Sequence, residues 1–413
     1  MFRTTGRLLA PIVLALAAPG MAQTWPAIDT AMKPLVDDGK LSGVVSIVVK
    51  DGKTVHHSAM GKRDLASGAP MEMDTIFRAF SMSKPVTAVA MMILYDEGKW
   101  KPSDPVTKFL PELKAVKLFK GMGADGKPIL EAPKALPTMG QLMTHTAGFA
   151  YGLMPGAVDD LYRANSPLAA QNGDDFVKRL AALPLAYEPG TKWQYSVSMD
   201  VQGAIIERIS GRKLADFMES RIFRPLRMVD TGFFVPADKR SRFATLYGWD
   251  KDKLVPLTSG QFASSYATAP GFASGGGGLV TTAGDYARLG QMLLNDGALD
   301  GARILKPGSA KIIMTDHIPP AIVNGKFGIG MQQIRPGYQF GYNGVVVTNP
   351  AAAAVDMGKG SYLWDGAAGT WFWVDPTNRL VFVGMIQRLM SSGAMPNVQR
   401  MSQAAVKASL AGN

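Results

Sequence analysis

The segment Ser81-Met82-Ser83-Lys84 stands immediately before an apolar run, VTAVAMMIL at residues 86–94. On a helix, positions three apart share a face, so the hydroxyl of Ser81 and the amine of Lys84 are expected to lie side by side. A serine hydroxyl is a weak nucleophile until a base removes its proton, and a neutral lysine can be that base. The segment therefore predicts a nucleophile and its base at the start of a helix.

The same Ser-x-x-Lys spacing recurs at Ser210-Gly211-Arg212-Lys213. There Gly211 follows a helical pattern and is expected to cap its C-terminus, with Lys213 starting the next helix, so this second match is interpreted as structural. Ser81 differs because it precedes a helix, where backbone N–H groups point outward and favour negative charge. From these residues alone, a plain N-cap serine is the alternative for Ser81.

Composition indicates a globular chain: 413 residues, 47% apolar and 19% charged, are enough for one or two domains. The chain has no cysteine, so its stability cannot depend on disulfides. The net charge of +11 is scattered along the chain. Because no basic block interleaves with aromatic residues, nucleic-acid binding is not expected.

The N-terminus has the pattern of a cleaved export signal. Arg3 and Arg7 precede an apolar stretch at residues 8–18, and Ala22 ends a small-residue cleavage site. The stretch is too short to span a bilayer comfortably, so no stable membrane anchor is expected. We therefore predict a signal peptide over residues 1–22, a mature chain of residues 23–413, and a periplasmic or secreted location.

Strand patterns occur at both ends of the chain and helical patterns between them. A hairpin is predicted over residues 43–60, around Asp51-Gly52. One antiparallel sheet flanked by helices is expected from residues of about 23–80 and 285–413, with an inserted, mainly helical part over about 81–284, an α+β arrangement. Further strands are predicted at residues 326–334, 344–348, 361–374 and 380–387, helices at 86–96, 139–146, 175–183, 199–209, 213–222, 282–295 and 397–410, and an exposed loop at 121–137.

The four histidines argue against a Ser-His-Asp hydrolase and against a metal site. His56 and His57 are neighbours in a predicted strand and point to opposite faces, whereas His145 and His317 stand far apart in the chain. No Gly-x-Ser-x-Gly segment is present, and no histidine cluster has metal-ligand spacing.

Tyr195-Ser196 is the second candidate element. The tyrosine lies between a turn and a predicted helix, where its hydroxyl can reach a neighbouring cleft. Near two lysines, Lys84 and Lys192, this hydroxyl is expected to have a lowered pKa and to carry protons. The alternative is a core tyrosine whose hydroxyl is bonded to backbone.

Three motifs follow one another along the chain: Ser81-Met82-Ser83-Lys84, Tyr195-Ser196 and Trp364-Asp365-Gly366. In this order the chain resembles the serine β-lactamase and penicillin-binding-protein superfamily, its class C branch, and most of all the family VIII carboxylesterases. The similarity covers nearly all of the mature chain and includes residues 77–80, 142–148, 275–286 and 364–376.

The resemblance implies a role for each residue. Ser81 would be acylated, while Lys84 and Tyr195 would serve as general base and acid. The backbone N–H groups of Ser81 and Ala367 would bind the oxyanion. Trp364, Asp365, Gly366 and Val197 would contact substrate, and no metal or organic cofactor is required.

Two departures from the lactamase pattern bear on substrate. Val197 stands where lactamases have an asparagine that binds the lactam side chain, and Trp364 stands where they have a lysine that binds a carboxylate. Losing a charge-assisted contact costs about 1.5–3 kcal/mol, and Asp365 repels an anionic substrate. We expect an exported hydrolase of small carboxylic esters, short in the acyl chain, with β-lactams as poor substrates. The alternatives are a class C-like β-lactamase or D-amino-acid peptidase, and a non-catalytic peptidoglycan-binding protein.

Overall fold

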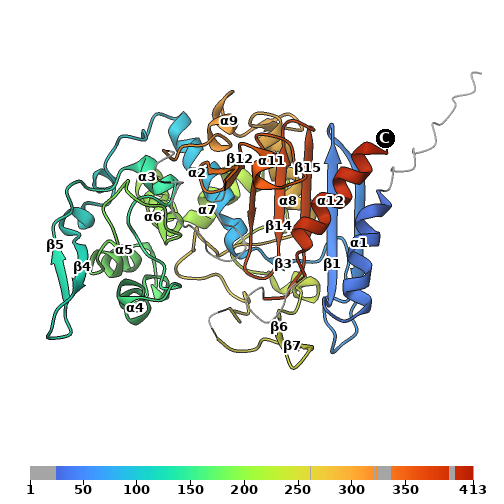
Figure 1. The fold of residues 1–413 in the computed structure, drawn as a ribbon, viewed down its shortest axis with the longest axis horizontal. Helices are drawn as coiled ribbons and strands as arrows, with labels where there is room; N and C mark the ends of the chain where they lie inside the picture. The colour runs from blue at the N-terminus through green and yellow to red at the C-terminus, as the bar shows by residue number, and fades with distance from the viewer. Residues whose placement is uncertain (1–24, 261, 320–321, 323–335, 390–395, 413) are drawn as a thin grey trace, which may run out of the picture.

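The computed structural model describes residues 25–260, 262–319, 322, 336–389 and 396–412. Its centre is a seven-stranded sheet in the order β11-β12-β13-β14-β15-β1-β2, and all its pairings are antiparallel (Figure 1). Two of these strands come from the N-terminal end of the chain and five from the C-terminal end. The predicted α+β sheet built from both chain ends is therefore confirmed. The strands are β1 (Gly43–Lys50), β2 (Lys53–Gly61), β11 (Tyr338–Phe340), β12 (Val345–Val347), β13 (Tyr362–Asp365), β14 (Trp371–Asp375) and β15 (Leu380–Met385).

The β1–β2 hairpin follows from local sequence. β1 is rich in β-branched residues and is buried along almost its whole length, and it pairs with β15 on one edge and β2 on the other. Asp51 and Gly52 connect the strands with φ angles of 49° and 76°. Two consecutive positive φ angles are typical of a tight type I′ turn, which glycine adopts without strain.

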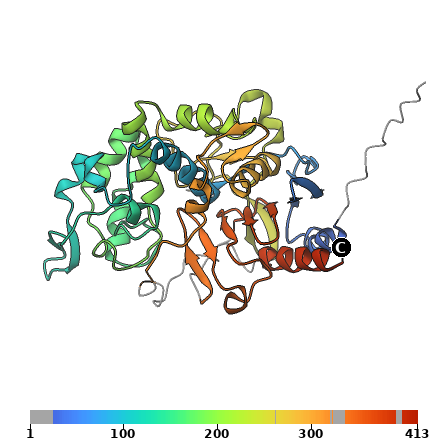
Figure 2. The ribbon, with the colours of Figure 1, turned by 90° about the horizontal axis from the view of Figure 1, so that it is seen from above.

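Helices cover both faces of the sheet. α8 (Ala283–Leu294) packs against β1, β14 and β15. α1 (Pro26–Asp37) and α12 (Val398–Ala411) pack against each other beside β1 (Figures 1 and 2). Trp371 in β14 donates its indole N–H to Ser402 of α12 over 3.1 Å, which fixes the C-terminal helix on the sheet.

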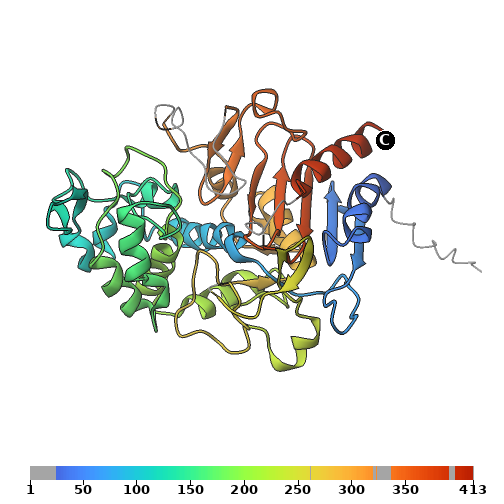
Figure 3. The ribbon, with the colours of Figure 1, turned by 60° about the horizontal axis from the view of Figure 1, so that its bottom comes forward.

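The inserted part lies on the far side of α2 (Ser83–Asp96), so this helix stands between the sheet and the smaller helices (Figures 1 and 3). Twelve of the fourteen residues of α2 are buried, which explains the nearly continuous apolar pattern at residues 86–94. The other helices of this part are α3 (Met139–Met143), α4 (Ala157–Ala164), α5 (Gly173–Ala181), α6 (Ser198–Ser210) and α7 (Leu214–Met218).

Two predictions of local structure were wrong. The expected loop at residues 121–137 contains part of a hairpin, β4 (Leu118–Met122) with β5 (Pro128–Glu131), whose Gly and Lys content hid the strand pattern. The expected strand at residues 361–374 is two strands, because the chain reverses between β13 and β14 at Gly369, where φ is 86°. The predicted strand at residues 326–334 lies outside the described residues, as does the predicted signal peptide at residues 1–22.

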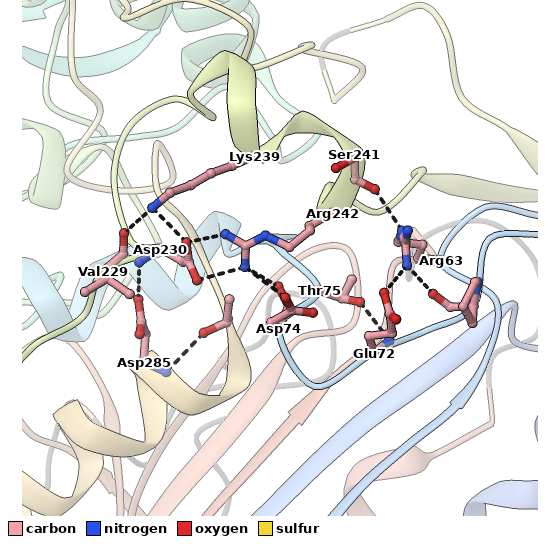
Figure 4. Close-up of polar contacts among 12 residues, drawn as sticks. Arg63, Glu72, Asp74, Thr75, Val229, Asp230, Lys239, Ser241, Arg242 and Asp285 are labelled. Atoms are coloured by element: carbon pink, nitrogen blue, oxygen red, sulfur yellow. Dashed lines mark hydrogen bonds and ion pairs between the residues drawn. The ribbon is translucent and has the colours of Figure 1, made fainter.

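An ionic cluster joins α8 to the segments at Asp74 and Arg242 (Figure 4). Arg242 donates to both carboxylate oxygens of Asp230 at 2.6 and 2.9 Å, and to the backbone carbonyl of Asp74 at 2.9 Å. Asp285 in the first turn of α8 accepts the Asp230 N–H at 2.7 Å. The cluster thereby ties α8 to the turn that leads into β3 (Phe77–Arg78), directly before Ser81. Among the described residues, no helix is long and apolar enough to cross a membrane.

Candidate active site

Ser81 lies in a single 3₁₀ turn, Phe80–Met82, that runs straight into α2. The preceding residue, Phe80, has a φ of 43°, which is strained for an aromatic residue. Hydrogen bonding of the adjacent Ala79 N–H to Leu279 O, at 2.9 Å, holds this turn in place. As a result Ser81 stays half-buried at the helix start, while Lys84 one turn later is fully buried.

The three predicted catalytic side chains meet. Ser81 Oγ lies 2.5 Å from Tyr195 Oη and accepts a hydrogen bond from Lys84 Nζ at 3.1 Å. Lys84 Nζ also donates to the Gly276 carbonyl at 2.6 Å and lies 4.5 Å from the centre of the Tyr195 ring. The Ser81 hydroxyl is thus in direct contact with both an amine and a phenol.

Burial sets the protonation state of Lys84. Desolvation lowers the pKa of its amine from 10.5 to about 7, and the negative charges of Asp200 and Asp365 oppose that fall. A substantial share of the amine is therefore neutral near pH 7. A neutral amine 3.1 Å from a serine hydroxyl can accept its proton.

The expectation of a lowered pKa for Tyr195 was wrong. Desolvation raises the pKa of its hydroxyl well above 10, and the negative charges of Asp365 and Asp200 add to the increase. Lys192, which is close in sequence, is exposed, whereas Lys84 lies over the face of the ring. Tyr195 is consequently neutral near pH 7 and suited to relaying a proton. Of the two side chains, Lys84 is the better proton acceptor at this pH.

Aromatic rings hold Tyr195 in position. Tyr151 stacks on it at 5.1 Å and Trp364 at 5.9 Å between ring centres. His145 packs against the same ring at 5.0 Å, and its Nδ1 accepts the Ser196 N–H at 3.2 Å. Burial lowers the pKa of His145 well below 6.5, so the imidazole is neutral and serves as packing.

The third motif lies against the chain directly before Ser81. A Cβ atom on Gly366 would lie 2.3 Å from the Ala79 carbonyl oxygen, so only glycine permits β13 to come this close to the chain before Ser81. Thr370 Oγ1 donates to that carbonyl at 3.2 Å. In the described part of the chain, neither Ser81 N–H nor Ala367 N–H donates to a backbone carbonyl.

The other residues predicted to contact substrate differ in their burial and their contacts. Trp364 lies inside β13, with its indole buried against Tyr195. Asp365 is half-buried and accepts a hydrogen bond from Gln399 at 2.8 Å. Val197 is fully buried and precedes α6, where its N–H donates to the Ala150 carbonyl at 3.1 Å. An apolar side chain suits this buried position two residues after Tyr195.

The second Ser-x-x-Lys match and the other histidines stand apart from this site. Gly211 caps α6 in the left-handed conformation, at a φ of 67°, as expected of a structural match. His56 contacts Ser46 at 2.9 Å, and His317 contacts the Ile312 carbonyl at 2.7 Å. Across the described ranges, no group of three or more acidic, histidine or cysteine residues could hold a metal ion.

Two polar residues of the site were missed by sequence reasoning. Asp200 is buried in the first turn of α6, and its Oδ1 accepts from Ser274 at 2.5 Å and from the Gly276 N–H at 3.1 Å. Asn343 donates to the Lys84 carbonyl at 3.0 Å. No motif marked either residue, and each contacts a segment more than 70 residues away in the chain.

Comparison with known proteins agrees with this geometry. Residues 28–405 match the Beta-lactamase family. The chain is 37% identical to Protein Rv1367c of Mycobacterium tuberculosis over 86% of this chain and 88% of that protein, and 33% identical to Esterase EstB of Burkholderia gladioli over 89% and 91%. The structure of EstCE1, described as a hydrolase with promiscuous acyltransferase activity, superposes with a TM-score of 0.77 at 25% identity over 92% of this chain and 97% of that chain. The chain therefore belongs to the β-lactamase family of serine hydrolases, and it is an enzyme whose relatives are esterases and acyltransferases.

Proposed function

We propose that this enzyme cleaves small carboxylic esters through an acyl-enzyme on Ser81. The observation that carries the proposal is the contact of Ser81 Oγ with both Tyr195 Oη and Lys84 Nζ, at 2.5 and 3.1 Å. A weakly acidic hydroxyl in contact with a neutral amine and a neutral phenol has what nucleophilic catalysis requires.

In the first half-reaction, neutral Lys84 takes the proton of Ser81 as Oγ bonds to the ester carbonyl carbon. The carbonyl π electrons move to oxygen, and the N–H groups of Ser81 and Ala367 stabilise the resulting oxyanion. When the tetrahedral intermediate collapses, the bond to the alkoxide breaks. Tyr195 passes a proton to the departing oxygen and regains one from Lys84, so that an alcohol leaves.

The second half-reaction repeats these steps with water. Water loses its proton to the Lys84–Tyr195 pair and adds to the acyl carbon, and Ser81 leaves with a proton as the acid is released. An alcohol that replaces water would yield a new ester by the same steps. The chain's similarity to EstCE1, a hydrolase with promiscuous acyltransferase activity, supports this variant.

Three side chains around the site favour esters over β-lactams as substrates. Val197 cannot hydrogen-bond a lactam side chain, and Trp364 contributes apolar surface where a cation would bind a carboxylate. Asp365 adds negative charge close to Lys84. We propose short acyl chains and neutral esters as substrates. The similarity to Esterase EstB supports esters as the substrate class, whereas the match to the Beta-lactamase of Escherichia coli is weaker, at 29% identity over 63% of this chain.

Export is part of the proposal. Arg3, Arg7 and the apolar stretch at residues 8–18 have the pattern of a signal peptide with cleavage near Ala22, so the enzyme would act in the periplasm or outside the cell.

Substrate choice is tested by steady-state kinetics on p-nitrophenyl butyrate, nitrocefin and a D-Ala-D-Ala peptide, with Ser81→Ala as the matched inactive variant. The proposal predicts a kcat/KM for the ester far above the other two. Nitrocefin turnover above ester turnover would instead establish a lactamase. N-terminal sequencing of the exported protein tests cleavage near Ala22.

A further inference from the structure

Asp200 is a buried acid for which the reaction steps above have no use. It lies five residues after Tyr195, in the first turn of α6, with no exposed surface. Its Oδ1 accepts two hydrogen bonds, from Ser274 Oγ at 2.5 Å and from the Gly276 N–H at 3.1 Å. Its Oδ2 has no hydrogen-bond partner among the residues that the structure describes. An incompletely paired carboxyl group in a dry interior costs stability, so a functional reason for it is expected.

The Gly276 peptide links this carboxyl group to the catalytic lysine. Its N–H faces Asp200, and its carbonyl oxygen accepts from Lys84 Nζ at 2.6 Å. A Cβ atom at position 276 would lie 2.6 Å from Asp200 Oδ2, so the close approach requires glycine. The neighbouring Gly275 carbonyl is bound by Thr87 of α2 at 2.7 Å. The glycine segment is therefore held between α2 and α6.

We propose that Asp200 is a positioning residue, whose carboxylate holds the Gly276 peptide so that its carbonyl directs the Lys84 amine towards Ser81 Oγ. This inference rests on the proposed function. A lysine side chain has four rotatable bonds, and it reaches the hydroxyl only while its other hydrogen-bond partner is fixed. The carboxylate at Asp200 provides that fixed partner through a single peptide unit.

The charge of Asp200 has a second, measurable consequence. The titratable groups facing Lys84 are Asp200 from α6, Asp365 from the end of β13, Tyr195, Tyr151 and His145. Burial lowers the pKa of Lys84, whereas Asp200 and Asp365 raise it. Removing the charge at Asp200 therefore lowers the pKa of Lys84 further, and the neutral base persists to lower pH.

The test is the pH dependence of kcat and KM for p-nitrophenyl butyrate in Asp200→Asn. We expect kcat to fall at least tenfold with KM changed less than threefold, and the acidic limb of kcat/KM to move to lower pH. Asp285→Asn is the matched control, because Asp285 also lies in the first turn of a helix and accepts a backbone N–H, but contacts none of the catalytic side chains. Asp285→Asn should leave the acidic limb of kcat/KM at its wild-type pH. The proposal would be overturned if Asp200→Asn kept both the wild-type kcat and the wild-type pH of the acidic limb of kcat/KM.

Ser274→Ala gives a second measurement in case Asp200→Asn does not fold. It removes one hydrogen bond and keeps the charge, so we expect a two- to fivefold loss of kcat with the limb unchanged. Wild-type kinetics in Ser274→Ala, together with an unfolded Asp200→Asn, would mean that the carboxyl serves folding alone and would refute the inference. Failure of the proposed function is distinguishable, because wild-type enzyme would then carry no acyl group on Ser81.

A separate observation concerns the β4–β5 hairpin, which projects from the end of the molecule farthest from α1 and α12 (Figures 1 and 3). Met122, Ile129 and Leu130 are 47%, 49% and 42% exposed on it. Five lysines and two acids lie in residues 114–134, a net charge of +3. Four of these lysines have no carboxylate within ion-pair distance in the described structure, namely Lys114, Lys117, Lys127 and Lys134.

From this combination we infer that the hairpin docks on an anionic phospholipid surface. Exposed apolar side chains on a segment that also carries unpaired lysines are complementary to the boundary between anionic head groups and acyl chains. Each lysine near such a surface strengthens binding by roughly fivefold at moderate salt. Exposed apolar groups alone would fit either a lipid surface or another protein. The positive charge of the lysines favours an anionic bilayer.

Sedimentation of the mature protein with vesicles tests the inference. Binding is expected to vesicles that contain phosphatidylglycerol, to weaken with salt, and to fall at least tenfold in Ile129→Ser/Leu130→Ser with ester turnover unchanged. Val229→Ser is the control, since Val229 is 71% exposed elsewhere on the surface. Equal binding to pure phosphatidylcholine, no binding at low salt, or a loss of self-association in the hairpin variant would each overturn it.

Discussion

Replacing Lys84 by methionine should make the protein more stable at neutral pH while abolishing turnover. Lys84 is fully buried, and its amine has a pKa of about 7 in place of 10.5. At pH 7 that depression corresponds to roughly 4 kcal/mol of lost folding stability. Methionine has a similar volume and no charge, but it leaves the Gly276 carbonyl without its donor, at a cost of about 1–3 kcal/mol. The net expectation is a gain of about 1–3 kcal/mol for Lys84→Met.

The pH dependence of this difference is the sharper test. Between pH 7 and 10.5 the unfolded lysine is protonated and the folded one is mostly neutral, so the unfolded state binds more protons and wild-type stability rises with pH. Urea unfolding of both proteins should show the advantage of Lys84→Met shrinking by about 3–4 kcal/mol from pH 7 to pH 10. Titrating groups that do not interact with Lys84 are common to both proteins and cancel. A difference that stays constant with pH would refute the assignment of a desolvated, neutral lysine.

Three further outcomes are expected. The acidic limb of kcat/KM should lie near pH 7, because Lys84 acts only when neutral; a limb below pH 5 would point to a carboxylate base instead. Tyr195→Phe should lower kcat by about 10²–10⁴-fold with little change in thermal stability, and near-wild-type turnover would remove the tyrosine from proton transfer. Asn343→Leu should cost about 1–3 kcal/mol in urea unfolding, because Gln202 loses the partner with which it exchanges hydrogen bonds at 2.7 and 3.0 Å. The double variant with Gln202→Leu should cost less than the sum of the two single changes, and full additivity would contradict the pairing.

Most of the fold could be predicted from local sequence patterns. The β-branched run at residues 43–50 and the Asp51-Gly52 turn predict a hairpin whatever surrounds them, and the structure has β1 and β2 there. The hairpin at β4 and β5 was missed because its exposed strands have Gly, Lys and Pro in place of an alternating apolar pattern. The break between β13 and β14 was missed because strand-forming residues continue on both sides of the turn, in which the chain reverses at Gly369.

The candidate site divides in the same way. Ser81, Lys84, Tyr195 and Trp364 were predicted from short motifs, and the structure brings them into one cluster. Motifs do not report three-dimensional surroundings. The pKa of Tyr195 was therefore predicted with the wrong sign, since its environment is a dry aromatic stack. Asp200 was missed for the same reason, because its partner Gly276 lies 76 residues away in the chain.

Acylation of Ser81 is tested most directly by the intact mass of the protein after brief mixing with p-nitrophenyl butyrate, followed by acid quenching and peptide mapping. We expect one butyryl group per chain, located on Ser81, in wild-type enzyme and none in Ser81→Ala. Ester turnover without that adduct in a pre-steady-state burst, or an adduct of equal occupancy in Ser81→Ala, would contradict it.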